Sequence, residues 1–387
     1  MKIILFDGTF KTTTFINRLA EGLSENHDVY IIGFNEQLNK KIHNVSYIAL
    51  GSNNSNIRFL KTSIKLRGFN LKQQLNLCSL LLKGKKRDIK EKNLQFVVNK
   101  IQPDIIHFQW VSVLSYVSNL SFPNHTKIIF SQRGFHINVR PFIDSDNMMF
   151  LRNVYPLIDG FHSVSKAIQH KSNLIYNSSS KKDQVVYSGF DHRNFPMKKN
   201  YDRGAIFQIL SVGRNHWIKD YTTAMKAMHI LKNKDVAFVY TIVGVEQDEE
   251  LLFLVNDLEL NENVKFINKV SQKKVYEMMC ASDVLLLPSI EEGIANVCIE
   301  AMFCKLPVLS TNCGGMRELI DTSTGFIVEK RSPKSMAEKL EDISKLENNT
   351  LELLTYKARE KVMVNHGASA MLHSMEVLYN KVIDGKK

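Results

Sequence analysis

Short apolar segments recur along the chain and alternate with longer segments in which apolar residues repeat at helical spacing. This alternation is typical of parallel sheets covered by helices, because strands that are buried on both faces are apolar throughout. The pattern occurs twice, and it predicts the α/β class with two Rossmann-like, doubly wound sheets. The expected strands are residues 2–6, 29–32, 105–108, 127–130, 208–212, 238–243, 264–267, 284–287 and 308–310.

The periodicity is interrupted between residues 189 and 204, where glycine, proline and charged residues gather. A chain of 387 residues exceeds one ordinary hydrophobic core, so we expect two domains. The N-terminal domain is predicted over residues 1–195 and the second over residues 196–367. The end of the chain, residues 368–387, is predicted to be helical.

The segment from residue 288 to 320 carries the strongest candidate chemistry. A buried strand ends at Pro288, a polar loop with Glu292 follows, and a helix is expected from Asn296, with Glu300 in its second turn. The amide groups at a helix start favour an anion, and carboxylates accept hydrogen bonds from vicinal hydroxyls. A nucleotide sugar offers both groups. The alternative is an exposed, acidic helix start that serves the helix dipole alone.

A second segment, residues 209–220, is predicted to be a strand followed by a loop with Arg214 and Lys219. Arginine offers a planar fork and lysine a mobile point charge, so together they can neutralise a diphosphate. Two surface cations in a basic protein are the alternative. The loop lacks the glycine-lysine-serine/threonine ending of a P-loop.

Residues 288–320 are similar to the motif of family 4 retaining glycosyltransferases of the GT-B fold. The resemblance covers most of the chain and is strongest from residue 209 to 328. It implies two Rossmann-like domains facing a central cleft, an acceptor-binding domain first, a donor domain second, and a last helix, 368–387, that crosses back to the first. The matching residues are Glu292, Gly293, Asn296, Val297, Glu300, Ala301, Met302, Pro307, Val308, Thr311, Gly314, Gly315 and Glu318.

The resemblance also implies roles for individual residues. Glu292 would contact the donor sugar, Glu300 would bind the ribose of the nucleotide, and Arg214 with Lys219 would hold the donor diphosphate. Lys305 departs from the family, which usually has glycine before the Leu-Pro pair. Backbone amides of the loop and helix start would hold sugar hydroxyls and the diphosphate; they belong to Gly293, Ile294, Ala295, Asn296 and Val297.

The loop after the first strand contains Gly8, where family members often carry a double glycine. Gly8 is our candidate for a donor contact there, and Thr12 to Thr14 are predicted to cap the following helix. Many relatives place a histidine near the donor sugar after the strand at 127–130. This chain has Arg133 at the aligned position and His136 three residues later, and either could contact the sugar or the acceptor.

Other histidines and the cysteines point to the scaffold. His107 and His162 lie beside apolar strand residues and are interpreted as structural. Five scattered cysteines, with no CxxC pair, match no common zinc pattern and are compatible with a reducing cytoplasm.

Basic residues are concentrated in one part of the chain, residues 58–92, which contain eleven lysines or arginines against two acidic residues. Leucine, isoleucine and phenylalanine residues, Phe69 among them, lie between the cations, so the segment is amphipathic. This composition is typical of an element that docks on an anionic membrane surface. No apolar run approaches the length of about 18 residues that spans a bilayer, so attachment would be peripheral. A solvated insertion is the alternative, and no nucleic-acid motif accompanies the charge.

The reaction implied by the resemblance is sugar transfer, of the hexosyltransferase type, from a UDP- or GDP-type donor to a hydroxyl of a glycan or lipid-linked acceptor, with retention at the anomeric carbon. No cofactor and no metal are expected, because the resemblance to GT-B glycosyltransferases implies metal-independent catalysis. Bacterial surface polysaccharide synthesis at the inner face of the plasma membrane is the expected setting. The alternatives are a sugar-nucleotide epimerase or hydrolase on the same scaffold, and a catalytically silent relative that only binds a nucleotide sugar.

Overall fold

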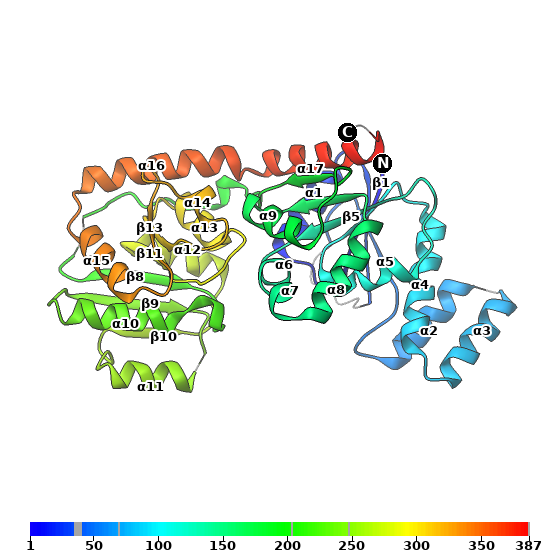
Figure 1. The fold of residues 1–387 in the computed structure, drawn as a ribbon, viewed down its shortest axis with the longest axis horizontal. Coiled ribbons are helices and arrows are strands. Elements are labelled where there is room, and N and C mark those ends of the chain that lie inside the picture. The colour runs from blue at the N-terminus through cyan, green and yellow to red at the C-terminus, as the bar shows by residue number, and fades with distance from the viewer. Residues whose placement is uncertain (35–40, 69, 203, 247, 386–387) are drawn as a thin grey trace. The chain divides into compact units, whose positions relative to one another are not determined.

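The computed structural model describes residues 1–34, 41–68, 70–202, 204–246 and 248–385. The chain divides into two compact units. The N-terminal unit comprises Met1–Val164, Ile168–Gly189 and Ala368–Lys387, and the C-terminal unit comprises Ser165–Ala167 and Phe190–Gly367 (Figure 1). Arg203, in the interval where the sequence indicates a boundary, lies outside the described residues.

A parallel sheet of seven strands, in the order β3-β2-β1-β4-β5-β6-β7, forms the centre of the N-terminal unit. The strand order reverses between β1 and β4, which makes their carboxyl ends the switch point of the sheet. The strands are β1 (Lys2–Gly8), β2 (Asp28–Gly33), β3 (Val45–Ala49), β4 (Ile105–Phe108), β5 (Lys127–Gln132), β6 (Gly160–Ser163) and β7 (Asp183–Val185).

Helices cover both faces of this sheet. Alternate side chains of β1 point to opposite faces: Ile4 and Phe6 join one core cluster, whereas Ile3 and Leu5 join another. Thr13 caps α1, as the sequence predicts, by accepting from the Ile16 amide. The helices are α1 (Thr14–Leu23), α2 (Asn56–Arg67), α3 (Leu71–Leu82), α4 (Lys86–Ile101), α5 (Ser115–Asn119), α6 (Phe135–Asn138), α7 (Arg140–Ile143), α8 (Ser145–Val154), α9 (Lys166–Ile175) and α17 (Ala368–Ile383).

The last helix, α17, packs in the N-terminal unit, although the whole C-terminal unit precedes this helix in sequence. It contacts α1, β6 and β7, and one of its faces is buried in the core cluster that contains Ile3 and Leu5. The buried residues of α17 are Met371, Met375, Leu378, Tyr379 and Val382. The C-terminal helix expected over 368–387 ends at Ile383, and residues 386–387 lie outside the described part of the chain.

His107 and His162 are both buried, in agreement with their interpretation as scaffold residues. They belong to a hydrogen-bonded chain in which Tyr379 Oη lies 2.8 Å from His107 Nδ1, and Ser131 Oγ lies 2.8 Å from both His107 Nε2 and His162 Nδ1. His162 Nε2 ends the chain on the Val186 carbonyl oxygen. The carbonyl oxygen requires a donor, so His162 Nε2 carries a proton and His162 Nδ1 accepts from the Ser131 hydroxyl. Ser131 Oγ in turn accepts from His107 Nε2, and His107 Nδ1 accepts from the Tyr379 hydroxyl. Every group in the chain is therefore satisfied when both imidazoles are neutral. Burial lowers the pKa of both histidines, that of His162 to about 3.

A parallel sheet of six strands, in the order β10-β9-β8-β11-β12-β13, forms the centre of the C-terminal unit. Its switch point lies between β8 and β11. The strands are β8 (Phe207–Val212), β9 (Phe238–Val243), β10 (Val264–Ile267), β11 (Val284–Leu287), β12 (Val308–Thr311) and β13 (Phe326–Val328). The helices are α10 (Tyr221–Lys232), α11 (Glu249–Asp257), α12 (Gln272–Ala281), α13 (Asn296–Phe303), α14 (Met316–Leu319), α15 (Pro333–Ser344) and α16 (Asn348–Asn365).

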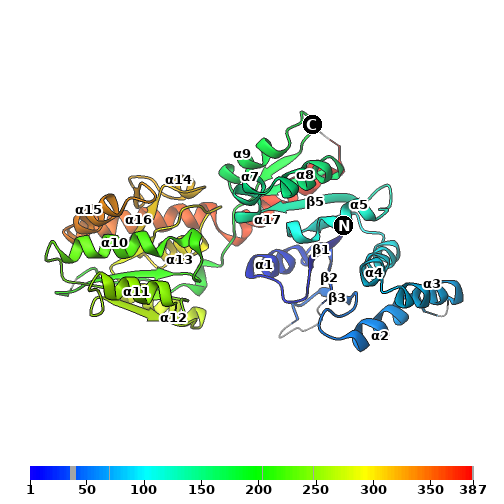
Figure 2. The same cartoon turned by 60° about the horizontal axis from the view of Figure 1, so that its bottom comes forward.

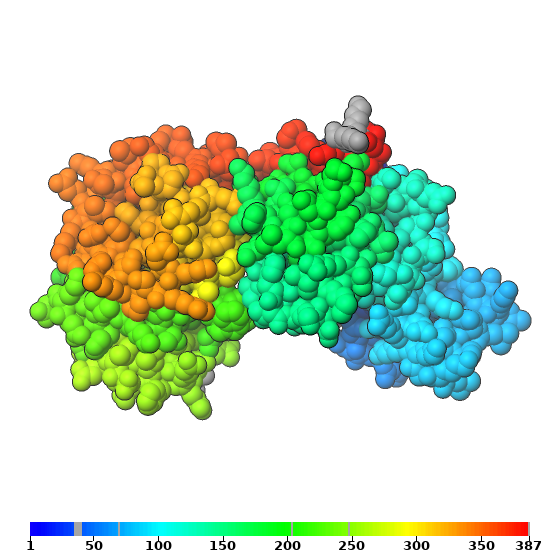
Figure 3. Space-filling model, in the orientation of Figure 1, coloured from blue at the N-terminus to red at the C-terminus, as the bar shows by residue number. Residues whose placement is uncertain are grey.

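The basic segment 58–92 folds as α2, α3 and the first half of α4, with Phe69 outside the described residues. The three helices contact one another, and α3 lies farthest from the sheet of the N-terminal unit (Figures 1 and 2). In the space-filling view they form a lobe at the edge of this unit (Figure 3). Among the described residues, we find no helix with both the length and the apolar character needed to cross a bilayer.

Candidate functional site

The main candidate site lies at the switch point of the C-terminal sheet. The loop after β8 contains Arg214 and Lys219, and the loop after β11 contains Glu292. Because β8 and β11 are adjacent and parallel, their carboxyl ends meet at one edge of the sheet. The fold therefore brings together two segments that lie more than 70 residues apart in sequence, as the 73-residue separation of Lys219 and Glu292 shows.

A direct contact joins the two loops. Lys219 Nζ donates to Glu292 Oε1 over 2.6 Å, and the hydroxyl of Ser289 donates to the same oxygen over 2.9 Å. The backbone agrees, since the Ile290 amide donates to the Ile218 carbonyl oxygen at 2.7 Å. The exposed fractions of the Lys219 and Glu292 side chains are 20% and 18%, so the pair is largely shielded from solvent but still accessible.

Positive charge dominates the loop after β8. Lys219 ends a short 3-10 turn, Trp217–Lys219, while Arg214 is exposed ahead of it. The pKa of His216, between them, is lowered by partial burial and then by the charges of Arg214 and Lys219. The loop thus places two permanent cations near a neutral imidazole, an arrangement that favours an anionic group.

Two glycines hold the Glu292 loop from the neighbouring strand. Gly314 has a φ of +48°, and a Cβ atom there would lie 1.7 Å from the Glu292 carbonyl oxygen. At Gly315 a Cβ atom would lie 2.2 Å from the Gly293 carbonyl oxygen, which accepts the Gly315 amide at 2.8 Å. Only residues without a side chain allow this approach, so the glycine pair fixes the backbone that carries Glu292.

Helix α13 begins immediately after this loop. Asn296 is its first residue, as the sequence predicts, and its N-cap is Ala295, which makes no side-chain cap. The Ala295 amide donates to the sulfur of Met316 at 3.4 Å, so it is already engaged. Gly293 is buried, Ile294 and Val297 are half-buried, and Asn296 is exposed. Of the predicted amide donors, those of Asn296 and Val297 belong to the first helical turn, where helix amides lack carbonyl partners four residues earlier.

Glu300 lies in the second turn of α13, as predicted. It is half-buried, and its Oε1 accepts a hydrogen bond from Gln272 Nε2 at 3.3 Å. Lys305, where the family usually has glycine, adopts a φ of +58°. A left-handed conformation costs a lysine more than a glycine, which explains the usual preference. The Tyr201 hydroxyl donates to the Lys305 carbonyl oxygen at 2.8 Å and helps to hold this turn.

The N-terminal unit gathers a second set of polar residues at its own switch point. Gly8 ends β1 with a φ of +87°, and Arg133 follows β5. The Arg133 guanidinium lies over the Phe15 ring, 4.1 Å from its centroid, and 5.3 Å from that of Trp110. Its Nη2 donates to Gln109 Oε1 at 2.8 Å and to Ser131 Oγ at 3.2 Å. Burial lowers its pKa to about 9.

Asp7, next to Gly8, is a candidate that the sequence analysis missed. Burial raises its pKa to about 6, although the Thr9 amide and the charge of Arg133 act in the opposite direction. Asp7 lies near the end of β1, and Gln109 and Arg133 follow β4 and β5; the three strands are adjacent. Their positions just after apolar strands are visible in the sequence, but the strand order that places them side by side is not.

His136 lies on α6 beside Phe135, with ring centroids 5.7 Å apart. The structure thus brings Arg214, Lys219 and Glu292 together in the C-terminal unit and places Arg133 close to the end of β1 in the N-terminal unit. Among the described residues, no group of three or more His, Cys, Asp or Glu side chains is arranged to hold a metal ion.

Comparison with known proteins places this site in a family. The model of glycosyl transferases group 1 matches residues 197–361. Residues 197–361 therefore belong to the glycosyl transferases group 1 family. This group 1 domain contains Arg214, Lys219, Glu292 and Glu300. The match includes all six strands of the C-terminal sheet.

Relatives extend the comparison. A putative colanic acid biosynthesis glycosyltransferase of Salmonella typhimurium is 29% identical over 206 residues, 51% of each chain. The N-acetylgalactosamine-N,N'-diacetylbacillosaminyl-diphospho-undecaprenol 4-alpha-N-acetylgalactosaminyltransferase of Campylobacter jejuni is 30% identical over 218 residues, 56% of this chain and 58% of that one. The chain thus spans about half the length of the curated relatives it matches.

The whole chain resembles solved structures. The structure of Anabaena HepE in complex with UDP and glucose has a TM-score of 0.72 and 16% identity, covering 97% of this chain and 98% of that one. The likeness shows the fold: the chain has the GT-B fold, with two Rossmann-like domains, as the sequence predicts.

Proposed function

We propose that the protein is a retaining, metal-independent glycosyltransferase. It would move a sugar from a UDP- or GDP-type donor to a hydroxyl of a glycan or lipid-linked acceptor in bacterial surface polysaccharide synthesis. The contact between Lys219 and Glu292 at the switch point of the group 1 domain carries this proposal. It places a cation for a phosphate and a carboxylate for sugar hydroxyls within one hydrogen bond of each other.

The diphosphate would bind to Arg214 and Lys219. The two cations exceed the charge of Glu292 by one, and the first turn of α13 adds its backbone amides. Glu292 would accept hydrogen bonds from hydroxyls of the donor sugar, while Glu300, one turn into α13, would accept those of the ribose. Gly314 and Gly315 would act indirectly, because they fix the backbone of the Glu292 loop.

The chemical step needs no protein nucleophile. The bond between the anomeric carbon and the donor phosphate oxygen breaks, and a bond to the acceptor oxygen forms on the same face. The acceptor proton passes to the departing phosphate oxygen, so charge and atoms balance. Arg214 and Lys219 stabilise the negative charge that develops on the phosphate, which is the electrostatic contribution that most often dominates such catalysis.

The relatives support the choice of substrates. The Salmonella relative is named for colanic acid biosynthesis, and the Campylobacter relative for transfer to a diphospho-undecaprenol-linked sugar. The HepE structure was determined in complex with UDP and glucose. A nucleotide-sugar donor and a surface-glycan acceptor, soluble or lipid-linked, are therefore the substrates to test first.

Thermal stabilisation by UDP, GDP, ADP and their common sugar conjugates tests the donor site. We expect one nucleotide class to raise the melting temperature of the wild type, but not that of Glu300→Ala or Arg214→Ala. Glu277→Ala, on neighbouring α12 and exposed, is the matched control and should respond like the wild type. No shift with any nucleotide would contradict the proposal, and binding without turnover toward any acceptor would indicate a silent relative.

We further propose that α2 and α3 dock on an anionic membrane surface. Exposed apolar side chains lie among the cations of these helices, including Ile57, Leu71, Leu75 and Leu82, the last of which is 89% exposed. Lysine and arginine would contact lipid phosphates while these apolar side chains enter the interface. Flotation with phosphatidylglycerol vesicles at low salt tests this; binding should be lost in Leu75→Ser/Leu82→Ser and with phosphatidylcholine alone, and no binding to anionic vesicles would exclude it.

A further inference from the structure

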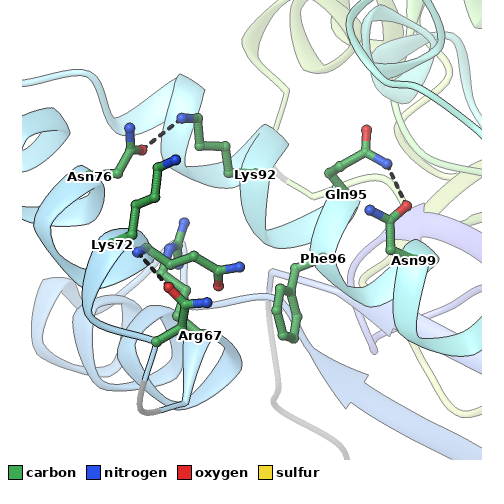
Figure 4. A pocket seen from close by; sticks show the side chains of 9 residues that line it. Arg67, Lys72, Asn76, Lys92, Gln95, Phe96 and Asn99 are labelled. Carbon is green, nitrogen blue, oxygen red and sulfur yellow. Dashed lines mark hydrogen bonds between the residues drawn. The ribbon is translucent and has the colours of Figure 1, made fainter.

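A cavity of about 510 Å³, lined mainly by polar and charged residues, lies among α2, α3 and α4, apart from both switch points. Its volume falls within the range of small-molecule sites. Among the described residues that line it, three are cations, Arg67, Lys72 and Lys92, and none is a carboxylate (Figure 4). The remaining lining residues are Asn70, Gln73, Asn76, Gln95, Phe96 and Asn99.

Arg67 is built into the wall of this cavity rather than lying on its surface. Its side chain is 7% exposed, and its Nη1 donates to the Ser63 carbonyl oxygen and to Asn93 Oδ1, both at 2.7 Å. Asn93 is itself fixed by the Leu50 carbonyl oxygen and the Ser63 hydroxyl, each at 2.8 Å. Burial lowers the Arg67 pKa. A guanidinium held in this way keeps a fixed orientation toward the cavity.

Two buried polar atoms at this cavity have no hydrogen-bond partner among the described residues. They are Nη2 of Arg67, a donor, and Oε1 of Gln73, an acceptor. A buried polar atom without a partner destabilises the folded protein, so atoms of this kind commonly bind water or a ligand. A ligand that satisfies both must offer an acceptor to Arg67 and a donor to Gln73, and an anionic oxygen beside a hydroxyl meets both requirements.

The other lining groups favour the same kind of ligand. Asn70 caps α3 through a hydrogen bond from the Gln73 amide at 3.1 Å, so the positive end of a 12-residue helix lies at the cavity. Lys92 Nζ donates a hydrogen bond to Asn76 Oδ1 at 2.7 Å, which holds the ammonium group at the cavity. Side-chain amides supply both donors and acceptors for hydroxyls, and the Phe96 ring offers an apolar face, the combination that suits a sugar.

We propose that the cavity bounded by Arg67, Lys72, Gln73 and Lys92 binds an anionic sugar, that is, a sugar that carries a phosphate or a carboxylate. The cations bind the anionic group, and the amides with Gln73 Oε1 bind the hydroxyls. If the protein is the glycosyltransferase proposed above, the site would hold an acidic residue of the acceptor glycan. Binding itself does not depend on that activity.

Ligand-observed NMR with glucose 1-phosphate and with glucuronic acid tests the site on the full-length protein. We expect at least one of them to bind at least tenfold more tightly than either glucose or inorganic phosphate. Lys72→Gln and Gln73→Leu should each weaken this binding about tenfold. Lys83→Gln, which removes an exposed cation from the C-cap of α3, outside the cavity, should leave it unchanged.

Further variants separate this site from the donor site and from the membrane. Binding of the anionic sugar should persist in Lys219→Gln. If binding is instead lost in Lys219→Gln and retained in Lys72→Gln, the ligand lies at the group 1 domain and the proposal is overturned. Equal losses in Lys72→Gln and Lys83→Gln would indicate general charge attraction only and would also overturn it. A third outcome is that neither soluble sugar binds, while the protein binds phosphatidylglycerol vesicles and loses this binding in Lys72→Gln. That result would identify a lipid headgroup as the ligand of the cavity and would overturn the proposal.

Discussion

Lys219 Nζ lies 2.6 Å from Glu292 Oε1, although the two residues follow different strands of the C-terminal sheet. We predict that Lys219→Met lowers kcat/KM by about 100-fold or more, since the removal of one preorganised charge from a developing anion typically costs that much. Lys219→Arg should retain part of the activity. Steady-state kinetics with the donor identified by thermal stabilisation measures both effects, and Lys226→Met, an exposed cation on α10, is the control.

The same contact predicts non-additive kinetics. Because each partner orients the other, the double variant Lys219→Met/Glu292→Gln should lose less activity than the two single losses combined. Strict additivity of the two free-energy changes would show that Lys219 and Glu292 act independently, and would count against their placement at one substrate.

Gly314 provides a prediction about the loop that carries Glu292. Gly314→Ala should destabilise the C-terminal unit by about 1–3 kcal/mol, because alanine is strained at a φ of +48° and its Cβ would collide with the Glu292 carbonyl oxygen. The displaced loop should also weaken nucleotide-sugar binding. Gly204→Ala is the control, because among the described residues no heavy atom beyond its chain neighbours lies within 4 Å of the added Cβ. Urea unfolding measures the stability of both variants, and thermal stabilisation by the nucleotide sugar measures their binding. Equal stability of the two variants would contradict this explanation.

The sequence predicted the central strands of both sheets because they are continuous apolar segments. It missed β3, β7 and β13, which lie at sheet edges and are only partly buried, so their apolar pattern is weak. The interpretation of His162 as a residue of a scaffold strand agrees with β6, in which a hydrogen-bonded chain satisfies the buried imidazole. Lys219 and Glu292 were found because each lies in a recognisable motif. Asp7 was missed because its raised pKa is caused by burial, which sequence spacing does not reveal.

The buried histidines predict a loss of stability in mild acid. The His162 pKa is lowered from 6.5 to about 3, so its contribution is fully present above pH 6.5 and is lost as the pH falls toward 3. Between pH 7.5 and 5.0 the free energy of unfolding should decrease by about 2 kcal/mol through this residue. His162→Gln should reduce that decrease, whatever its absolute stability. Urea unfolding at the two pH values checks this, and an identical decrease in wild type and variant would contradict it.

Asp7 predicts an opposite pH dependence in the same unit. Its pKa is raised from 3.8 to about 6, so the folded protein holds the proton more tightly than the unfolded chain. This contribution is fully present below pH 3.8 and is lost as the pH rises through 6. Asp7→Asn should therefore make the decrease between pH 7.5 and 5.0 larger by about 1 kcal/mol. The same unfolding experiment measures it, and a smaller decrease in the variant would show that the sign is wrong.

Tyr379 links the end of the chain to the centre of the N-terminal sheet. Its hydroxyl is 2.8 Å from His107 Nδ1, and its ring is fully buried. Tyr379→Phe removes the donor and leaves a buried acceptor without a partner, so we expect a loss of about 1–3 kcal/mol. Tyr356→Phe, on α16 and 51% exposed, should change stability little.

Deletion of residues 368–387 should have a larger effect than Tyr379→Phe. It removes the buried face of α17, and it exposes the apolar side chains of the core cluster in which Met375 and Leu378 are buried. We expect a much lower urea midpoint for the N-terminal unit, or failure to fold. An unchanged unfolding curve for the truncated chain would show that α17 contributes no stability to this unit. For the point variants, equal effects of Tyr379→Phe and Tyr356→Phe on stability would show that the Tyr379–His107 hydrogen bond does not stabilise it.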